Sequence, residues 1–348
     1  MANPRDESRY GRGFEDGLEP LTPLDPSQTD SVDKLVRAMS ATAFGGRCLG
    51  EAADVLEAMV RDENCFRVLT VSGAMTIAKQ GLVMCEMIER GWIQAVVATG
   101  ALMTHGLTEG AGMLHFKHAE SMRDEDLYGK GYNRVYDTIE LEKNLDDVEK
   151  LLQQALEDLP ENVMLSSRLV CEQLGRFLQK GGAQRAVLKS AFECKVPIYV
   201  PAFTDSELGL DLSIHNHLRR KAGGRTFPFD PFLDLDDFAE RVRQRGILGI
   251  FTIGGGVPRN WAQQVGPYLE ILRSRLGSKE PVRRYKYAVR ICPEPVHWGG
   301  LSGCTYSEGV SWGKFVPPEE GGRFAEVMAD ATIAWPLVVR AVIERLER

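Results

Sequence analysis

The segment from Trp298 to Lys314 is the part of the sequence best equipped for chemistry. It reads WGGLSGCTYSEGVSWGK and brings the carboxylate of Glu308, the indole of Trp312 and the amine of Lys314 within seven residues. A lysine beside an aromatic ring is partly removed from water, which favours the neutral amine and makes it a nucleophile toward imines. The carboxylate and the indole face would hold an organic cation. By composition alone, a surface loop with a solvated lysine and a packed tryptophan is the commoner structure for such a segment.

Histidines and cysteines give weaker signals. His115 and His118 are three residues apart and His215 and His217 are two apart, but no recognisable set of metal ligands surrounds either pair. The chain also lacks the GxSxG motif of serine hydrolases. We therefore expect no metal centre and no Ser-His-Asp triad. The seven cysteines are scattered singly without a CxxC pair, which predicts reduced thiols packed in the fold.

The composition is that of a folded protein. Of 348 residues, 43% are hydrophobic and 26% are charged, which excludes a disordered or fibrous chain. A formal net charge of −7 disfavours a nucleic-acid binder, which needs a basic surface, and suits a cationic small ligand. No apolar run is long enough to cross a membrane, and the charged N-terminus lacks the apolar stretch of a signal peptide. We therefore predict a cytoplasmic protein that neither enters a membrane nor binds nucleic acid.

The first 30 residues differ from the remainder of the chain. Residues 1–30 are rich in Asp, Glu, Pro and Gly and show no apolar period, which predicts a flexible N-terminal arm. We expect residues 31–348 to form a single domain. Between residues 32 and 60, apolar side chains recur at helical spacing on either side of a glycine-containing stretch at 42–47, which predicts two helices.

The chain beyond these two helices alternates between short β-type runs and amphipathic helical segments. Such alternation is typical of an α/β fold with a mostly parallel sheet and helices on both faces. The segments occupy residues 66–71, 77–90, 93–99, 151–156, 166–179, 196–203, 247–253, 287–292 and 324–327.

Small or polar residues follow several of the expected strands, at 72–74, 99–101, 204–206, 254–256 and 330–332. In an open α/β sheet, ligands bind beyond the carboxyl ends of the strands, where glycine lets the backbone approach a phosphate and helix N-termini supply N–H donors. Together these sites predict a nucleotide crevice. Each site taken singly is typical of an ordinary turn. The chain contains neither GxGxxG nor GxxxxGK[ST], so the standard dinucleotide and P-loop motifs do not support the prediction.

The string EGVSWGK at residues 308–314 closely resembles the EAVSWGK signature of the deoxyhypusine synthase family, whose lysine forms a covalent imine. Further blocks resemble that family in the family's order, and the resemblance covers about residues 35 to 345. These blocks are TAFG at 42–45, SGA at 72–74, TGA at 99–101 followed by His105, NRVYD at 133–137, PAFTD at 201–205, GGGV at 254–257 and ADA at 329–331.

The resemblance implies a doubly wound, Rossmann-like NAD-binding fold and a homotetramer of tight dimers with active sites at the dimer interface. It implies an NAD-dependent aminobutyl transferase that oxidises spermidine or a related polyamine and holds the aminobutyl group on lysine as an imine. The group then passes to an acceptor amine, which is a translation-factor lysine in the activity that names the family. An imine intermediate needs an uncharged lysine in a pocket poor in water, which agrees with the chemistry expected of residues 308–314.

The resemblance also implies roles for single residues. Lys314 would be the catalytic nucleophile, and His105 would lie near the nicotinamide as a second catalytic residue. Trp312 would form a wall along the polyamine and Glu308 would anchor one of its ammonium groups. The positions that match the family's NAD-binding residues are Ser72, Gly73, Ala74, Thr99, Gly100, Ala101, Asp205, Gly254, Gly255, Gly256, Asp330 and Ala331.

Several positions depart from the family pattern. Trp298 and Leu301 stand where the family has aspartates before the lysine. Asn260 replaces a histidine of the substrate site, and Leu210 replaces an acidic residue that has Asp211 as its neighbour here. We assign Asn260 and Asp211 to substrate binding. Because a buried ammonium without a paired carboxylate is costly, these changes indicate an altered substrate or acceptor.

Three alternatives to the namesake activity stay open. The acceptor could be a free diamine such as putrescine, which would give a homospermidine-type product. The chain could be an NAD-binding homologue that has lost turnover, since a fold does not fix a function. A metal-dependent amidine hydrolase is the third alternative.

Overall fold

A computed structural model describes residues 5–160 and 162–348. Its centre is a six-stranded sheet in the order β6-β2-β1-β7-β8-β9, in which every pair of neighbouring strands is parallel. The strands are β1 (Cys65–Val71), β2 (Ala95–Ala98), β6 (Ile198–Tyr199), β7 (Ile247–Ile253), β8 (Tyr285–Ile291) and β9 (Arg323–Val327).

The strand order defines a doubly wound sheet. From β1 the chain proceeds through β2 to β6 at one edge, and then returns through β7 and β8 to β9 at the other edge. The direction of winding therefore reverses between β1 and β7, which is the point where open α/β sheets bind ligands. This arrangement confirms the predicted α/β fold with a mostly parallel sheet and helices on both faces.

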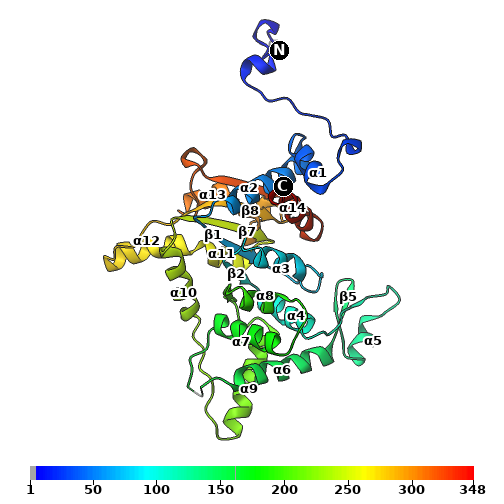
Figure 1. Ribbon diagram of the computed structural model, residues 1–348, viewed down its shortest axis with the longest axis vertical. Helices are drawn as coiled ribbons and strands as arrows, with labels where there is room; N and C mark the ends of the chain where they lie inside the picture. Colours follow the sequence, from blue (N-terminus) through cyan, green and yellow to red (C-terminus); the bar gives the residue numbers. More distant parts are fainter. Residues whose placement is uncertain (1–4, 161) are drawn as a thin grey trace.

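Helices cover both faces of the sheet, so that the central strand β1 is buried along its whole length. All seven residues of β1 are buried, and successive side chains alternate between two hydrophobic clusters: Val68 belongs to one cluster and Leu69 to the other. Such continuous burial is expected of a parallel strand with helices on both sides. Figure 1 shows the sheet between these layers.

The larger cluster joins the sheet to helices α1–α4, α6–α9 and α14, and the smaller cluster joins it to α10–α13. Among the described residues, none of these helices combines the length and apolar character needed to cross a lipid bilayer. The helices are α1 (Val32–Ser40), α2 (Phe44–Arg61), α3 (Gly81–Glu89), α4 (Gly100–Gly110), α5 (Asp124–Gly129), α6 (Glu142–Glu157), α7 (Ser167–Lys180), α8 (Val187–Glu193), α9 (Glu207–Lys221), α10 (Phe232–Arg243), α11 (Gly256–Gln263), α12 (Val265–Leu276), α13 (Tyr306–Ser311) and α14 (Ala331–Leu346).

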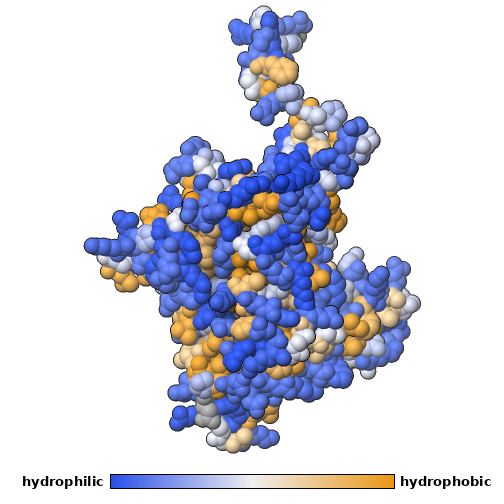
Figure 2. Space-filling view, viewed as in Figure 1, coloured by the Kyte–Doolittle hydropathy of each residue, from blue (hydrophilic) through white to orange (hydrophobic). Residues whose placement is uncertain are grey.

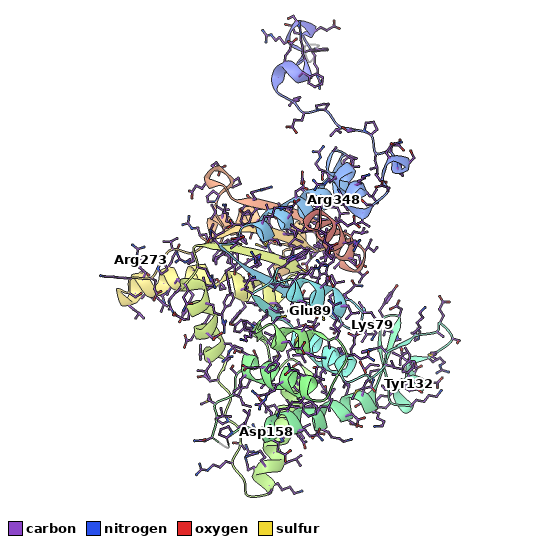
Figure 3. All side chains as sticks on the ribbon, in the orientation of Figure 1. Lys79, Glu89, Tyr132, Asp158, Arg273 and Arg348 are labelled. Carbon is purple, nitrogen blue, oxygen red and sulfur yellow. The ribbon has the colours of Figure 1, made fainter. Side chains whose placement is uncertain are left out.

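A second, antiparallel sheet projects from the body beside α4 and α6 (Figure 1). It consists of β3 (Phe116–Lys117), β4 (Tyr132–Val135) and β5 (Thr138–Leu141) in the order β3-β5-β4, and Tyr132 marks it in Figure 3. The sequence did not predict this sheet. Its strands have at most four residues, and β3 and most of β4 are exposed, so they lack the apolar alternation that identifies a strand.

Two predicted segments differ from the observed elements. Only Ile198–Tyr199 of the expected strand at 196–203 pairs with β2, because the chain turns immediately afterwards toward the N-terminus of α9. The expected helix at 77–90 begins at Gly81, since Lys79 has a φ of +61°, which a helix does not allow. The two helices expected between residues 32 and 60 are confirmed as α1 and α2.

Most of residues 5–31 extend away from the rest of the molecule (Figure 1), and the Thr22 N–H donates to the carbonyl of Ala41, at the end of α1, over 2.9 Å. Their short helical turns, η1 (Glu7–Arg9), η2 (Gly13–Asp16) and η3 (Pro26–Gln28), contain no buried residue. Tyr10 and Phe14 expose 55% and 77% of their surface, and Figure 2 shows hydrophobic residues on this arm. The flexibility of the arm and the single domain at 31–348 stay predictions, and residues 1–4 lie outside the described residues.

A buried ionic cluster ties the two ends of the folded part together. The Nε atom of Arg345 in α14 lies 2.6 Å from Oδ1 of Asp33 in α1, and both side chains are fully buried. Arg345 also contacts Asp54 at 2.7 Å and Glu57 at 3.1 Å, both in α2. Burial raises the pKa of Asp33, but hydrogen bonds from Arg345 and Arg37 outweigh this effect and hold the pKa below its ordinary value.

Replacing Arg345 with methionine should lower the free energy of unfolding by about 3–5 kcal/mol, because the Asp33 carboxylate would stay buried without its cation. Urea denaturation would measure the change. The control is Arg340→Met, which removes an exposed partner of Glu344 on the same helix and should cost under about 1 kcal/mol. Equal losses in the two variants would contradict the importance of the buried cluster.

Candidate active site

The backbone of Lys314 is fixed by strand-like hydrogen bonds. Helix α13 ends at Ser311, three residues earlier, and Gly313 then adopts a φ of +70°, a value that glycine reaches without strain. The Tyr285 N–H, at the start of β8, donates to the Lys314 carbonyl over 2.9 Å, and the Lys314 N–H donates to the Gly309 carbonyl over 3.1 Å. The course of the chain therefore holds the lysine beside the sheet.

The side chain of Lys314 is almost wholly removed from solvent. The residue is 8% exposed, and its Nζ donates to Oδ1 of Asn260 over 3.0 Å. Nζ also lies 5.9 Å from the centre of the Trp312 ring. Asn260 stands one turn into α11, the helix that follows β7. The neutral amide satisfies one N–H without offering the negative charge that would hold a proton on the amine.

Burial and charge both favour the neutral amine. Burial lowers the pKa of Lys314 below its ordinary value, and the positive charge of Arg259 lowers it as well. The Cys304 thiol and Glu308 act in the opposite direction without reversing the shift. Arg259 is 2% exposed and its guanidinium lies 5.1 Å from the centre of the Tyr306 ring. Its Nε and Nη2 atoms have no hydrogen-bond partner among the described residues.

Lys314, Asn260, Glu308 and Trp312 line one cavity of about 290 Å³. This volume is near the lower end of the range for small-molecule sites, about 300 Å³ and upward. The structure thus brings the four predicted residues together in one cavity, although Asn260 lies far from the other three in the sequence. The other lining residues are Arg259, Gln263, Gln264, Val296, Gly299, Gly300, Leu301 and Cys304.

Three polar residues that line this cavity were not predicted from the sequence. Gln263 and Gln264 follow Asn260 by three and four residues, so a helix beginning at Gly256 places them on its face. Arg259 directly precedes Asn260 in the sequence and lines the same cavity. Helical spacing counted from Asn260 places Gln263 and Gln264 on the same face of the helix, so this spacing is the signal that could have identified them.

The strand ends at the switch point form a second, adjoining site. The Gly255 N–H donates to Oγ of Ser72 over 2.9 Å and thereby joins the carboxyl end of β7 to that of β1. Gly254 has a φ of +74°, and a Cβ atom there would lie 2.2 Å from the Ser72 hydroxyl. Only glycine fits at position 254, so this turn is set by the close approach of the two strand ends.

Backbone groups are open to a ligand at this switch point. Gly73 has a φ of +75°, and its carbonyl accepts a hydrogen bond from the Thr99 hydroxyl over 3.2 Å. Gly256 begins α11 with a φ of +60° and open space where a side chain would be. Among the described residues, no side chain caps the N-terminus of α11, and uncapped N–H groups at a helix N-terminus are suited to binding an anion.

The loop at 299–304 connects the glycine turn at the switch point with the lysine cavity. A Cβ atom on Gly255 would lie 2.5 Å from Cα of Ser302, so this loop rests directly on the glycine turn. The buried Arg290 holds the loop by donating to the carbonyls of Ser302 and Cys304, the latter over 3.0 Å. The two sites are therefore neighbours that share α11 and this loop.

The remaining predicted NAD-binding positions lie at the carboxyl edge of the sheet in different surroundings. Ala74 follows Gly73, and Gly100 and Ala101 open α4. Asp205 precedes Ser206, whose side chain packs against Gly100. Asp330 and Ala331 stand at the far edge, where the Asp330 carboxylate accepts hydrogen bonds from the N–H and hydroxyl of Thr332, at 2.7 and 2.8 Å, and caps α14.

Two predicted residues do not line the lysine cavity. His105, on α4, places Nδ1 3.0 Å from Oε2 of Glu140. Burial raises the pKa of Glu140, but hydrogen bonds from His105, His115 and Asn144 outweigh this effect and bring it to about 2. The functional roles predicted for His105 and Asp211 stay predictions.

Asp211 is only 3% exposed, whereas its neighbour Leu210 is 53% exposed. A shift of one residue turns a helical side chain by about 100°, so the acidic group here faces the interior. Burial, together with the carboxylates of Glu207 and Glu149, raises the pKa of Asp211 to about 7.

The fold and the buried lysine define a doubly wound α/β protein with a buried amine near the switch point of its sheet. The chain belongs to the deoxyhypusine synthase family, since the model of that family, described as deoxyhypusine synthase, matches residues 34–342. It is accordingly a transferase, and the family's reaction is the transfer of an aminobutyl group from spermidine.

Relatives of the chain carry the family's name. The protein named "Probable deoxyhypusine synthase 2" of Methanosarcina mazei is 34% identical over 327 residues, which cover 94% of this chain and 90% of the relative. The protein of the same name from Archaeoglobus fulgidus is 33% identical, with 88% and 96% covered. A "Deoxyhypusine synthase-like protein" of Chlorobaculum parvum is 30% identical, with 88% and 85% covered.

Solved structures support the fold. A structure from Entamoeba histolytica assigned as a deoxyhypusine synthase has a TM-score of 0.60 at 15% identity and covers 93% of this chain and 97% of that one. The ternary complex of AgrE with ornithine and NAD+ has a TM-score of 0.52 at 10% identity, with 88% of this chain and 34% of that chain covered. At these identities the likeness is one of fold.

Reductive methylation of Lys314 should reach its half-maximal extent at a lower pH than for an ordinary lysine, because the lowered pKa makes the neutral amine available at lower pH. Arg259→Met should move this midpoint upward, since it removes a positive charge, and Glu308→Gln should move it downward, since it removes a negative one. Peptide mass spectrometry across a pH series would measure the midpoint. Shifts of the same sign in both variants would contradict this account of the site.

Proposed function

We propose that this protein is an NAD-dependent aminobutyl transferase that acts on spermidine or a related polyamine through an imine on Lys314. The observation that carries the proposal is the state of the Lys314 amine. It is buried, it is paired with the Asn260 amide over 3.0 Å, and its pKa is lowered. An amine with these properties is prepared to attack a carbon–nitrogen double bond.

The crevice at the switch point suits NAD. The open backbone at Gly73 and Gly256 and the uncapped N-terminus of α11 match what a pyrophosphate requires. A protein of similar fold, AgrE, forms a complex with NAD+. When bound, NAD would accept a hydride from the carbon beside the secondary amine of the polyamine and return it at the end of the reaction.

Lys314 would carry the group between the two hydride transfers. Its neutral Nζ attacks the carbon of the oxidised amine, the bond to the leaving amine breaks, and the proton lost by Nζ departs with that amine. The aminobutyl group then remains on Lys314 as an imine. The acceptor amine attacks the same carbon and releases Lys314, and reduction completes the product. Throughout, Asn260 holds one N–H of Nζ, and Glu308 supplies the charge that attracts the polyamine.

The open rim of the cavity supports assembly with further copies of the chain. Trp312 is 65% exposed, and Trp298 and Leu301, at 71% and 48%, add apolar surface beside it. Water hydrolyses an imine, so the exposed rim of the cavity would have to be shielded from solvent during the reaction. A homotetramer with active sites at the dimer interface would supply that shielding from the partner subunit.

A free diamine is a second candidate acceptor, and the cavity's composition favours it. Asn260 replaces the family's histidine directly at the lysine, and Leu301 lines the cavity where the family has an aspartate. Among the described lining residues, Glu308 is the one carboxylate. These changes leave Lys314 intact, so they bear on the choice of amine rather than on imine formation. The grouping of Lys314, Trp312 and Glu308 speaks against a homologue without turnover.

Incubation of the whole protein with NAD and spermidine, followed by borohydride, should leave an aminobutyl adduct on Lys314. Intact mass and peptide mapping would detect it. The adduct should be absent in Lys314→Ala and when NAD is left out, and it should persist in the control Lys279→Ala, which alters an exposed lysine. A protein that binds NAD yet forms no adduct with any of a panel of polyamines would overturn the proposal.

Replacing Asn260 with histidine should raise transfer to a translation-factor lysine relative to transfer to putrescine. The imidazole accepts a proton from an incoming ammonium near neutral pH, which the amide cannot do. Product ratios in a mixture of both acceptors would measure the change. Lys279→His, which places the same imidazole at an exposed position outside the cavity, is the control and should leave the ratio as it is. An unchanged ratio in Asn260→His would exclude this residue as the determinant of the acceptor.

A further inference from the structure

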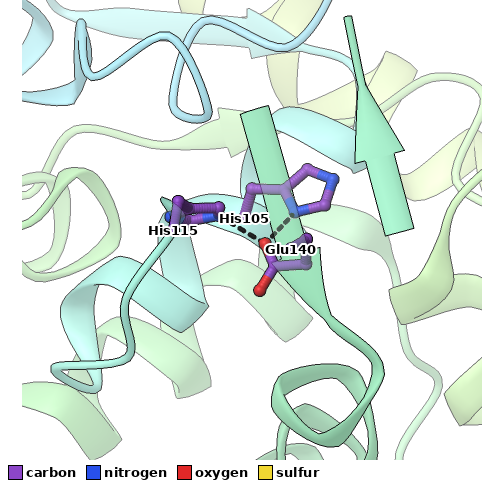
Figure 4. A group of neighbouring side chains, drawn as sticks. All are labelled: His105, His115 and Glu140. Atoms are coloured by element: carbon purple, nitrogen blue, oxygen red, sulfur yellow. Dashed lines mark hydrogen bonds and ion pairs between the residues drawn. The ribbon is translucent and has the colours of Figure 1, made fainter. Parts of the chain in front are cut away.

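A second group of chemically capable side chains lies outside the lysine cavity. His105 comes from α4, His115 from the loop after α4, and Glu140 from β5 of the small sheet (Figure 4). One ligand atom from each residue lies within 4.8 Å of the others. Both imidazoles approach the same carboxylate oxygen, Oε2 of Glu140: Nδ1 of His105 at 3.0 Å and Nε2 of His115 in closer contact. We call these three residues the His–Glu cluster.

The His–Glu cluster is buried and its carboxylate is held in place. The side chains of His115 and Glu140 are each 1% exposed, and that of His105 is 16% exposed. The second oxygen of Glu140, Oε1, accepts a hydrogen bond from the Asn144 amide over 2.6 Å. Asn144 thus leaves Oε2 to face the two imidazoles. Outer hydrogen bonds of this kind are the usual means by which proteins orient a coordinating carboxylate.

We propose that the His–Glu cluster binds a single divalent transition-metal ion of the Zn²⁺ class. Zn²⁺ takes imidazole nitrogen and carboxylate oxygen ligands at about 2.0–2.2 Å, so two such ligands in a tetrahedral site are about 3.4 Å apart. The 3.0 Å separation between His105 Nδ1 and Glu140 Oε2 therefore needs to open by about 0.4 Å, and the closer contact between His115 Nε2 and the same oxygen needs to open by more.

The number of ligands describes the kind of site. Two histidines and one carboxylate are a ligand set of zinc sites that keep an open position. Within the described parts of the chain, no fourth His, Cys, Asp or Glu joins the group. The fourth position therefore belongs to a solvent molecule or to a ligand, which can reach it because His105 retains some exposure.

Lys79 is the one neighbour that opposes the metal. Its Nζ lies 2.8 Å from Nδ1 of His115 and 3.3 Å from Oε1 of Glu109, and Figure 3 shows Lys79 at the surface beside the small sheet. A lysine ammonium can only donate, so it favours the His115 tautomer with its proton on Nε2. That tautomer suits a hydrogen bond to Glu140, whereas a metal needs Nε2 free of a proton. Lys79 and the metal therefore compete for His115.

A metal ion at this position would join the small sheet, through Glu140, to α4, through His105. The small sheet projects from the body (Figure 1), and α4 begins at Gly100, one of the predicted NAD-binding residues. A bond from β5 to α4 through the ion would fix the sheet against that helix. The ion would thus stabilise the wall of the crevice without taking part in the chemistry at Lys314.

Titration of the full-length protein, stripped with a chelator, with Co²⁺ tests the proposal. The expected result is one equivalent bound per chain, with the visible absorption of a four- or five-coordinate ion and displacement by Zn²⁺. His115→Ala and Glu140→Gln should each weaken binding by more than about 100-fold, since even the loss of an outer hydrogen bond typically costs about 10- to 100-fold. Circular dichroism would verify that both variants fold.

Two further variants separate the metal from a hydrogen-bonded cluster. Lys79→Met should tighten Co²⁺ binding, because it removes the competing donor to His115. His217→Gln, which alters an exposed histidine on α9, is the matched control and should bind like the parent protein. Absence of stoichiometric binding, or binding that survives in both His115→Ala and Glu140→Gln, would show that Glu140 is only a hydrogen-bond acceptor and overturn the proposal.

Discussion

The hydrogen bond from the Gly255 N–H to Ser72 Oγ, at 2.9 Å, closes the sheet where its winding reverses. The residues of both sites are positioned relative to this contact. It sets the turn at Gly254, the turn sets where α11 begins, and α11 carries Asn260 to the lysine. Because β1 and β7 are buried on both faces, neither strand can slide to relieve the close approach. A side chain at position 254 would therefore displace the crevice and the lysine cavity together.

The partner of the Lys314 amine determines what the cavity can do. An amide accepts a hydrogen bond without a charge, so the lysine is held without being kept protonated. A carboxylate at position 260 would hold the amine as firmly and suppress its nucleophilicity. In the proposed reaction the polyamine would need a negative charge, and Glu308, which lines the cavity, would supply it. The separation of these two tasks explains how the cavity can accept cationic amines and still contain a reactive one.

The sequence predicted those features that depend on local pattern. Buried strands such as Cys65–Val71 are mostly apolar, and the EGVSWGK string placed Glu308, Trp312 and Lys314 in one segment, which the structure brings into one cavity. It could not predict the His–Glu cluster, because His115 meets Glu140 only through the pairing of short, exposed strands with no periodic signal. Nor could it show that Asp211 turns inward, which depends on how α9 packs against α6.

Main-chain hydrogen bonds hold the backbone of Lys314 beside Tyr285, at the start of β8, and these bonds involve no side-chain atom. The backbone conformation at position 314 therefore does not depend on hydrogen bonds made by the side chain there. Protein engineering gains from this independence: a cysteine, a homologous amine or a photoreactive amino acid placed at position 314 would meet the same arginine, amide and indole. The site is thus a scaffold in which the reactive group at position 314 can be exchanged while the surrounding residues are kept.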